Sequence, residues 1–175
     1  MKAYELFRLL DPAELDGIVL AACADPEIPE KIAGGVLTYR KIPLKRFAKL
    51  PEETRKAYVR RTLRDKQASD LALFVLSAAL TRSNAGMISA FLDAVELPHE
   101  GASLSVEGEI PAPPAKKLKA AVDQLLAAHP PRDAAIYLHA FASQPDVHWD
   151  ALDQRLETDP KLKIEDRSGE EPTPA

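Results

Sequence analysis

Many of the fifteen prolines in this chain stand where an α-helix would begin. At the first helical position proline loses no hydrogen bond, whereas inside a helix it removes one and collides with the preceding turn. The string Asp11-Pro12-Ala13-Glu14 shows the whole pattern, because it supplies an N-cap residue, a proline and an acid for the first turn. The prolines therefore predict a series of helices with defined starting points.

Apolar residues at i, i+3 and i+4 spacing continue from these starts and predict about eight to nine helices. They lie at residues 11–23, 26–39, a short segment after 43, 51–64, 69–80, 87–95, 118–126, 130–141 and 149–156. The segment from Ser69 to Leu80 is apolar on every side, so we expect it at the centre of the fold. Gly34 and Gly35 each weaken the second helix by about 1 kcal/mol relative to alanine, which favours a kink or a close helix contact there.

The predicted fold is all-α, a compact bundle or array of helices in one domain over residues 1–164. A chain of this length buries roughly 70% of its unfolded surface, which is enough for one core. Residues 101–114 contain two glycines and three prolines without a helical period, so we expect an internal loop there. Residues 165–175 hold no large apolar side chain, and we expect a disordered tail.

An internal repeat would make the fold an array. A shift of 63 residues places Val59 and Leu63 on Val122 and Leu126, and a shift of 64 continues the match in the next helices. This favours two related helix triplets. Helical periodicity alone produces matches of this kind, and it is the stronger explanation.

The single cysteine, Cys23, rules out an internal disulfide, and its apolar neighbours predict a buried side chain. The first residues lack the apolar core and cleavage site of a signal peptide. The longest apolar run, Leu71 to Leu80, is about half the length that spans a bilayer. We therefore expect a cytoplasmic protein that does not enter a membrane, and the pattern leaves its oligomeric state open.

Positive charge is concentrated between Arg40 and Lys66. This stretch holds eleven basic and three acidic residues, so it carries +8 in a chain whose net charge is −4. On a helix that begins near Pro51, most basic side chains fall opposite Tyr58 and Leu63, which predicts an outward basic face. The candidate partner-binding residues are Lys45, Arg46, Lys49, Lys56, Arg60, Arg61 and Arg64.

Several interpretations fit this charge. The first is a non-enzymatic helical interaction module whose basic face binds an acidic protein partner. The second is nucleic-acid binding by the same face, although no aromatic side chains for base stacking are interleaved with the cations. The simplest interpretation is a solvated helix face whose charge is met by acids elsewhere in the fold.

A small enzyme with a histidine and carboxylate site is the third possible function. His139 lies in an apolar helix, where a buried histidine with a structural partner is the simpler interpretation. The string Glu96-Leu97-Pro98-His99 matches the Glu-x-x-His pattern of di-iron bundles, but its proline breaks the helix and no second copy exists. His129 and His148 add no metal-binding spacing, so we expect no metal site.

Signatures of nucleophilic catalysis and of cofactor binding are missing from the sequence. It contains no Gly-x-Ser-x-Gly elbow and no glycine-rich phosphate loop followed by Lys and Ser or Thr. We therefore expect neither a catalytic residue nor a cofactor.

Two segments, from Phe91 to Gly101 and from Ile136 to Phe141, resemble parts of small uncharacterised bacterial helical proteins. The resemblance covers less than half of the chain and implies a helical fold without an assigned activity. It points to the loop that begins at Pro98-His99-Glu100 as a place for a surface site.

Overall fold

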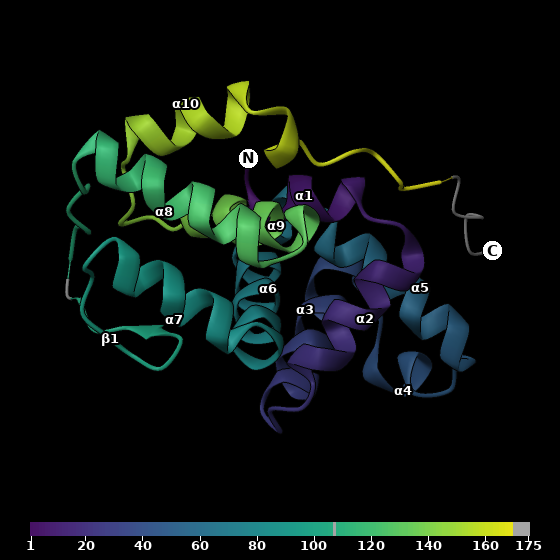
Figure 1. Cartoon of the computed structure of the whole chain (residues 1–175). Helices are drawn as coiled ribbons and strands as arrows, with labels where there is room; N and C mark the ends of the chain where they lie inside the picture. Colours follow the sequence, from purple (N-terminus) through teal and green to yellow (C-terminus); the bar gives the residue numbers. More distant parts are fainter. Residues whose placement is uncertain (107, 170–175) are drawn as a thin grey trace. The chain divides into compact units, whose positions relative to one another are not determined.

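The computed structural model describes residues 1–106 and 108–169 (Figure 1). The described residues form ten α-helices, two 3-10 helices and one pair of very short strands, which confirms the predicted all-α fold. The described chain groups into two compact units, residues 2–82 with 165–169, and residues 83–164. The expectation of a single domain over residues 1–164 stays a prediction.

The first unit contains six α-helices. They are α1 (Ala3–Leu9), α2 (Pro12–Ala22), α3 (Ile28–Arg40), α4 (Leu44–Phe47), α5 (Glu52–Leu63) and α6 (Ser69–Ser83), with the 3-10 turn Lys66–Ala68 before α6. The capping box predicted at Asp11 is present, because its carboxylate accepts a hydrogen bond of 2.8 Å from the Glu14 amide. Pro43 and Pro51 immediately precede α4 and α5, as their helix-starting role predicts.

Helix α1 is the element that the sequence pattern did not indicate. Its N-terminus is closed by Glu5, whose carboxylate accepts a hydrogen bond of 2.8 Å from the Lys2 amide. Leu6 and Phe7 are fully buried. A seven-residue helix is marginal in water by itself, so its apolar contacts within the unit hold it in place.

Helix α5 packs against both α3 and α2 and brings the basic segment onto the first unit. The interior here is aliphatic, with Leu15, Val36 and Leu63 wholly removed from water. The prediction that the Leu63 side chain points into the core is thus confirmed. An aliphatic core of this kind is stabilised by roughly 1.5–3 kcal/mol for each fully buried side chain.

Helix α6 is buried along one side, and the expectation that all its sides avoid water is wrong. Val75 and Leu76 are inaccessible, but Phe74 is 37% exposed. The ammonium of Lys31 lies 4.4 Å from the centroid of the Phe74 ring and covers it in part. The predicted close contact at the glycine pair is present, since a methyl group at Gly35 would collide with the side chain of Leu71.

The second unit contains α7 (Ala85–Ala94), α8 (Ala115–Ala128), α9 (Pro131–Ala142) and α10 (Asp150–Thr158), followed by the 3-10 turn Pro160–Leu162. Helix α8 packs on α7, and α9 packs on α8 and α10. Phe91 meets the rings of Tyr137 and Phe141 edge to face, with centroids 5.5 and 5.6 Å apart. Trp149 joins this aromatic cluster at 5.0 Å from Phe141 and is the packing anchor expected from its place at a helix entry.

The strands β1 (His99–Glu100) and β2 (Ser103–Leu104) form a small antiparallel hairpin at the start of the predicted loop. Farther along the loop, the Trp149 indole donates a hydrogen bond of 2.9 Å to the Ile110 carbonyl. The Ile110 amide in turn donates to the Asp146 carbonyl at 2.8 Å. These bonds hold the second half of the loop against the start of α10.

The grouping of the helices into units does not follow the 63-residue shift, in keeping with helical periodicity as the explanation of that match. Helices α8, α9 and α10 lie together in the second unit, but the preceding triplet is divided between the two units at Arg82 and Ser83. In the predicted tail, residues 165–169 have no helix or strand, and the Arg167 amide donates a hydrogen bond of 2.8 Å to the Leu9 carbonyl. The rest of the predicted tail, residues 170–175, lies outside the described residues.

Candidate functional site

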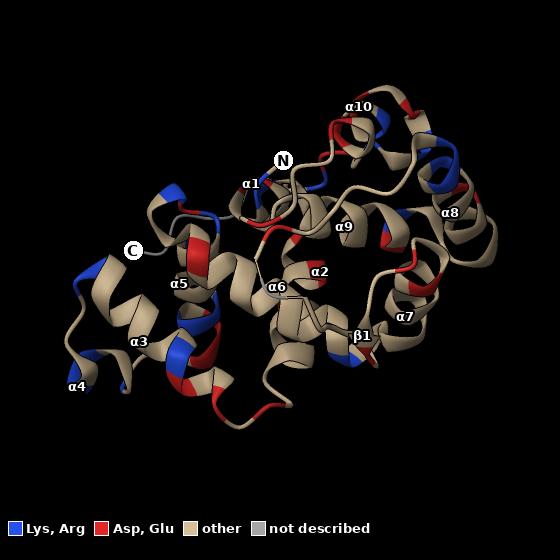
Figure 2. Ribbon diagram, turned by 90° about the vertical axis from the view of Figure 1, so that its left-hand side faces the viewer, with Lys and Arg blue, Asp and Glu red and all other residues tan. Residues whose placement is uncertain are grey.

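The basic segment from residue 40 to residue 66 covers the end of α3, all of α4 and α5, and the turn before α6. Figure 2 shows only basic colouring on α4, whereas α5 carries basic and acidic positions together. The cations of this segment differ in their surroundings: two of the predicted binding residues make structural contacts, and a third is paired with acids of its own helix.

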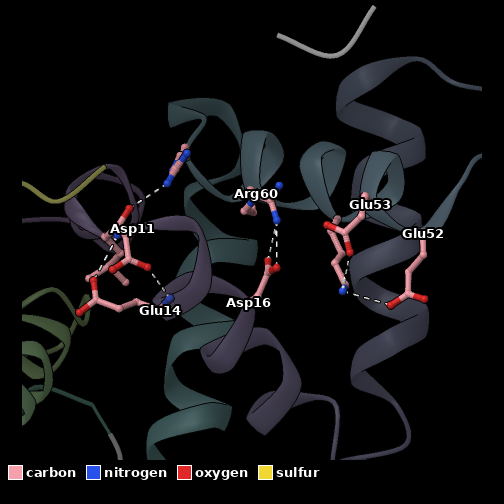
Figure 3. A network of polar contacts seen from close by, with 9 residues as sticks. Asp11, Glu14, Asp16, Glu52, Glu53 and Arg60 are labelled. Carbon is pink, nitrogen blue, oxygen red and sulfur yellow. Dashed lines mark hydrogen bonds and ion pairs between the residues drawn. The ribbon is translucent and has the colours of Figure 1, made fainter. Parts of the chain in front are cut away.

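Arg60 points into the unit, so its predicted place on an outward basic face is wrong. Its side chain is only 11% exposed, and its guanidinium donates two hydrogen bonds of 3.0 and 2.9 Å to the carboxylate of Asp16 on α2. Figure 3 shows the two side chains facing one another between the helices. A cation buried in this way needs its carboxylate for stability and is removed from the contact surface.

Arg64 closes the C-terminus of α1. Its guanidinium donates hydrogen bonds of 3.0 and 2.8 Å to the carbonyls of Phe7 and Leu10, which have no helical partner of their own. A cation at this end also interacts favourably with the helix dipole. Arg64 is therefore a structural residue as well.

Lys56 is neutralised within its own helix. Its ammonium lies 2.9 Å from the Glu53 carboxylate and 3.1 Å from that of Glu52, in the first turn of α5 (Figure 3). The hydrogen bond to Glu53, followed by the one to Glu52, raises the pKa of Lys56, and the same bond lowers the pKa of Glu53. Lys56 therefore keeps its proton but presents little net charge to a partner.

Four exposed cations between residues 45 and 55 have no ion pair with any described residue. They are Lys45, Arg46, Lys49 and Arg55, which we call the α4–α5 cation group. Arg61 is exposed as well, but it lies in the last turn of α5, two turns away from Arg55. Of the predicted binding residues, Lys45, Arg46, Lys49 and Arg61 thus keep an accessible charge.

An apolar groove lies next to this cation group. Helices α2, α3 and α5, with Phe47 of α4, enclose an open space of about 400 Å³. This volume falls within the range of about 300–1,000 Å³ that is typical of ligand-binding pockets. Arg55 belongs to both features, since it lines the groove and carries one of the unpaired charges.

Each of the three helices contributes one stripe of side chains at helical spacing. The stripe of α2 runs through Val19, Leu20 and Cys23, and the stripe of α3 through Pro29, Ile32 and Ala33. The stripe of α5 begins with charged residues, Glu52, Arg55 and Lys56, and ends at Val59. Residues at i, i+3, i+4 and i+7 share one helix face, so three faces converge on the same space.

Leu20 is the residue of this groove that sequence reasoning missed. It is 75% exposed, more than any other large apolar side chain in the described part of the chain, and it lines the groove. The sequence carries a signal for it. Helix α2 has more apolar residues than one buried face requires, and the fully buried Leu15 already belongs to that face. Burial raises the pKa of the Cys23 thiol, so Cys23 lies in the groove as a neutral side chain.

His99 and His139 of the second unit make structural contacts. His99 has its Nδ1 2.6 Å from the Gly101 carbonyl and its Nε2 3.1 Å from the Asp93 carboxylate. Because both neighbours are acceptors, the hydrogen bond to Asp93 and then the one to Gly101 raise the pKa of His99. The ring thus joins the β1–β2 hairpin to the end of α7.

His139 is buried in α9, and its pKa is shifted in the opposite direction from that of His99. Its Nε2 lies 3.1 Å from the Leu162 carbonyl, so this nitrogen carries the proton of the neutral ring and donates it. Desolvation lowers the pKa of His139. The ring therefore joins α9 to the final 3-10 turn, as the structural interpretation of this residue predicts.

No group of three or more His, Cys, Asp or Glu side chains in the described part of the chain could hold a metal ion. Among the described residues, no single helix is long and apolar enough to cross a bilayer, and only the successive segments Lys66–Ser83 and Ala85–Ala94 reach that length and composition together, with a bend between them.

Comparison of the chain with protein-family models, with curated proteins and with solved structures finds no match.

Proposed function

We propose that this protein is a helical interaction module whose first unit binds an acidic protein partner through the α4–α5 cation group. The observation that carries the proposal is the division among the basic residues. Arg60, Arg64 and Lys56 are occupied within the fold, whereas Lys45, Arg46, Lys49 and Arg55 remain exposed and unneutralised by described acids.

The physical argument concerns the cost of binding. A cation that already has a partner must lose it before it can bind an anion, so its net contribution to affinity is small. An unpaired exposed cation has no such cost, and several on one surface add to the rate of encounter with a negatively charged molecule. Four such cations within residues 45–55 form a compact target for acidic side chains.

A protein partner suits this surface better than a nucleic acid. Nucleic-acid binding requires cations along a backbone path and, for single strands, exposed aromatic rings on which bases stack. Phe47 is buried, and the other apolar side chains that line the groove with it are aliphatic apart from Cys23. Aliphatic surface bordered by cations is complementary to a polypeptide that carries both apolar and acidic residues.

The proposal is tested with a labelled poly-glutamate peptide, measured by fluorescence anisotropy between about 50 and 200 mM salt. The first variant removes the four charges as Lys45→Gln, Arg46→Gln, Lys49→Gln and Arg55→Gln. The matched control removes four exposed cations elsewhere, as Arg82→Gln, Lys116→Gln, Lys161→Gln and Lys163→Gln. Both variants have the same net charge and both change surface residues.

We expect the first variant to lose roughly tenfold in affinity and the control to change by less than about twofold, since each exposed pair contributes up to about 1 kcal/mol. Equal losses in both variants would overturn the proposal, because the effect would then follow net charge alone. Labelled single-stranded DNA and RNA complete the assay. Tighter binding of either one than of the peptide, lost in the first variant, would replace the proposal with nucleic-acid binding.

A further inference from the structure

We propose that the groove between α2, α3 and α5 binds the apolar face of an acidic amphipathic helix from a partner protein. This inference rests on the proposed function and adds the form of the partner. The groove supplies an apolar seat for side chains of one helix face, and the α4–α5 cation group supplies charges for the acids that flank that face.

The shape of the groove favours a helical occupant. Its walls are helices, and a helix packs between helices when its side-chain ridges enter the grooves between their side chains. An extended peptide usually adds to the edge of a sheet. Residues 2–82, all of which the structure describes, contain no strand.

The lining sets the chemistry of the contact. Val19 and Leu20 of α2 lie on one side, Ile32 and Ala33 of α3 on another, and Val59 of α5 completes the wall. A partner helix that places aliphatic or aromatic residues at i, i+3, i+4 and i+7 would bury these side chains together with its own. Exposed Leu20 would gain most, because it has most surface left to bury.

The charges at the groove determine the sign of the partner. Two acids, Asp16 and Glu52, line the groove, but Asp16 is bound to Arg60 and Glu52 lies 3.1 Å from Lys56. Arg55 is the lining residue whose charge no described carboxylate neutralises. Lys45 and Arg46 lie on α4, whose Phe47 also lines the groove, and Lys49 follows the end of that helix, so further unpaired cations flank a lining residue in the chain.

A second open space in the same unit has a different character. It lies between α3 and α6 beside the glycine pair, with a volume of about 390 Å³. Lys31 closes part of it by covering Phe74, and Lys31 is itself 3.4 Å from Glu27. The lining charge without a described partner there is the acid Asp70, which does not attract an acidic partner, so the α2–α3–α5 groove carries the inference.

The test uses three labelled peptides of equal net negative charge. The first is an amphipathic helix with leucines on one face and glutamates elsewhere, the second has the same composition in an order without an apolar face, and the third is poly-glutamate. We expect the first peptide to bind at least about tenfold more tightly than the second, since burial of one leucine already supplies a factor of this size.

The chain offers a matched pair of surface leucines. Leu20→Ser removes apolar surface at the groove, whereas Leu44→Ser removes it from α4 outside the groove, where Leu44 is 62% exposed. We expect Leu20→Ser to abolish the preference for the amphipathic peptide and Leu44→Ser to leave it unchanged. Both side chains are exposed, so neither change should unfold the protein.

Cys23 gives an independent readout, because it lines the groove and is the single cysteine of the chain. The amphipathic peptide at saturation should slow alkylation of Cys23 by a maleimide, and poly-glutamate should not. An unchanged alkylation rate with the amphipathic peptide bound would overturn the inference, because the peptide would then lie outside the groove.

The outcomes separate the two proposals. Equal binding of all three peptides, insensitive to Leu20→Ser but lost on removal of the α4–α5 cation group, overturns the groove inference and supports the proposed function. Loss of binding in the Leu20→Ser variant with no effect of the four charge changes overturns both proposals, since the acids would then not be recognised. Absence of binding by every peptide also overturns both.

Discussion

The guanidinium of Arg60 on α5 donates two hydrogen bonds to the carboxylate of Asp16 on α2, at 3.0 and 2.9 Å. The two residues are 44 positions apart in the chain. Their pairing turns one of the basic side chains of α5 toward the interior and fastens α5 to α2, which are two walls of the groove.

Asp16→Ala should destabilise the protein, because it leaves a nearly buried guanidinium without its carboxylate. We expect the free energy of unfolding in urea to fall by about 1–3 kcal/mol. Glu53→Ala removes the exposed partner of Lys56 and is the matched control, with an expected change of up to about 1 kcal/mol. Equal effects of the two changes would show that the Asp16 pair adds no more than a surface contact.

His99 and His139 should shift stability with pH in opposite directions. The pKa of His99 is raised, so its contribution is complete below the unfolded value of about 6.5 and is lost as the pH rises through the folded pKa. The pKa of His139 is lowered, so its contribution is complete above about 6.5 and is lost as the pH falls toward the folded pKa.

Melting temperatures of His99→Gln and His139→Gln between about pH 5 and pH 8.5 measure these contributions against the wild type. The deficit of His99→Gln should be largest at the acidic end, and the deficit of His139→Gln at the alkaline end. Parallel profiles for the two variants would contradict the opposite assignments of charge.

The glycine pair of α3 should respond unequally to alanine. Apart from the neighbouring residues and backbone of its own helix, no atom lies within 4 Å of the position that a methyl group would take at Gly34, so Gly34→Ala should stabilise the protein by about 0.5–1 kcal/mol. At Gly35 the methyl group would displace the side chain of Leu71, and that displacement offsets the gain. Denaturation in urea should place Gly35→Ala at least about 1 kcal/mol below Gly34→Ala. Equal stabilities would mean that Leu71 moves without cost.

The helical fold could be predicted from the sequence because its signals are local. Proline and N-cap residues mark helix starts within a few positions, as at Asp11. The spacing of apolar residues in α5 predicts which side of the helix is buried, as Leu63 shows. Helix α1 lacked both a proline and an N-cap side chain, so its start at Lys2 carried no such signal.

The candidate site could be predicted only in part, because it depends on contacts between distant segments. Helical spacing places Lys56, Arg60 and Arg64 along one stripe, and nothing in that spacing shows that Asp16 and the end of α1 meet two of them. The groove also escapes sequence reasoning, since three stripes converge only in the folded unit. Leu20 was the one indication in the sequence, because α2 has more apolar residues than one buried face requires.

Reversal of charge at the α4–α5 cation group tests the central claim most directly. The variant Lys45→Glu, Arg46→Glu and Lys49→Glu is compared with a control that has the same net charge, Lys116→Glu, Lys161→Glu and Lys163→Glu. The probes are the amphipathic glutamate peptide and its counterpart with lysine in place of every glutamate. We expect the first variant to lose the glutamate peptide and to bind the lysine peptide more tightly than the control does. Identical preferences in the two variants would contradict the account, because the position of the cations would then not matter.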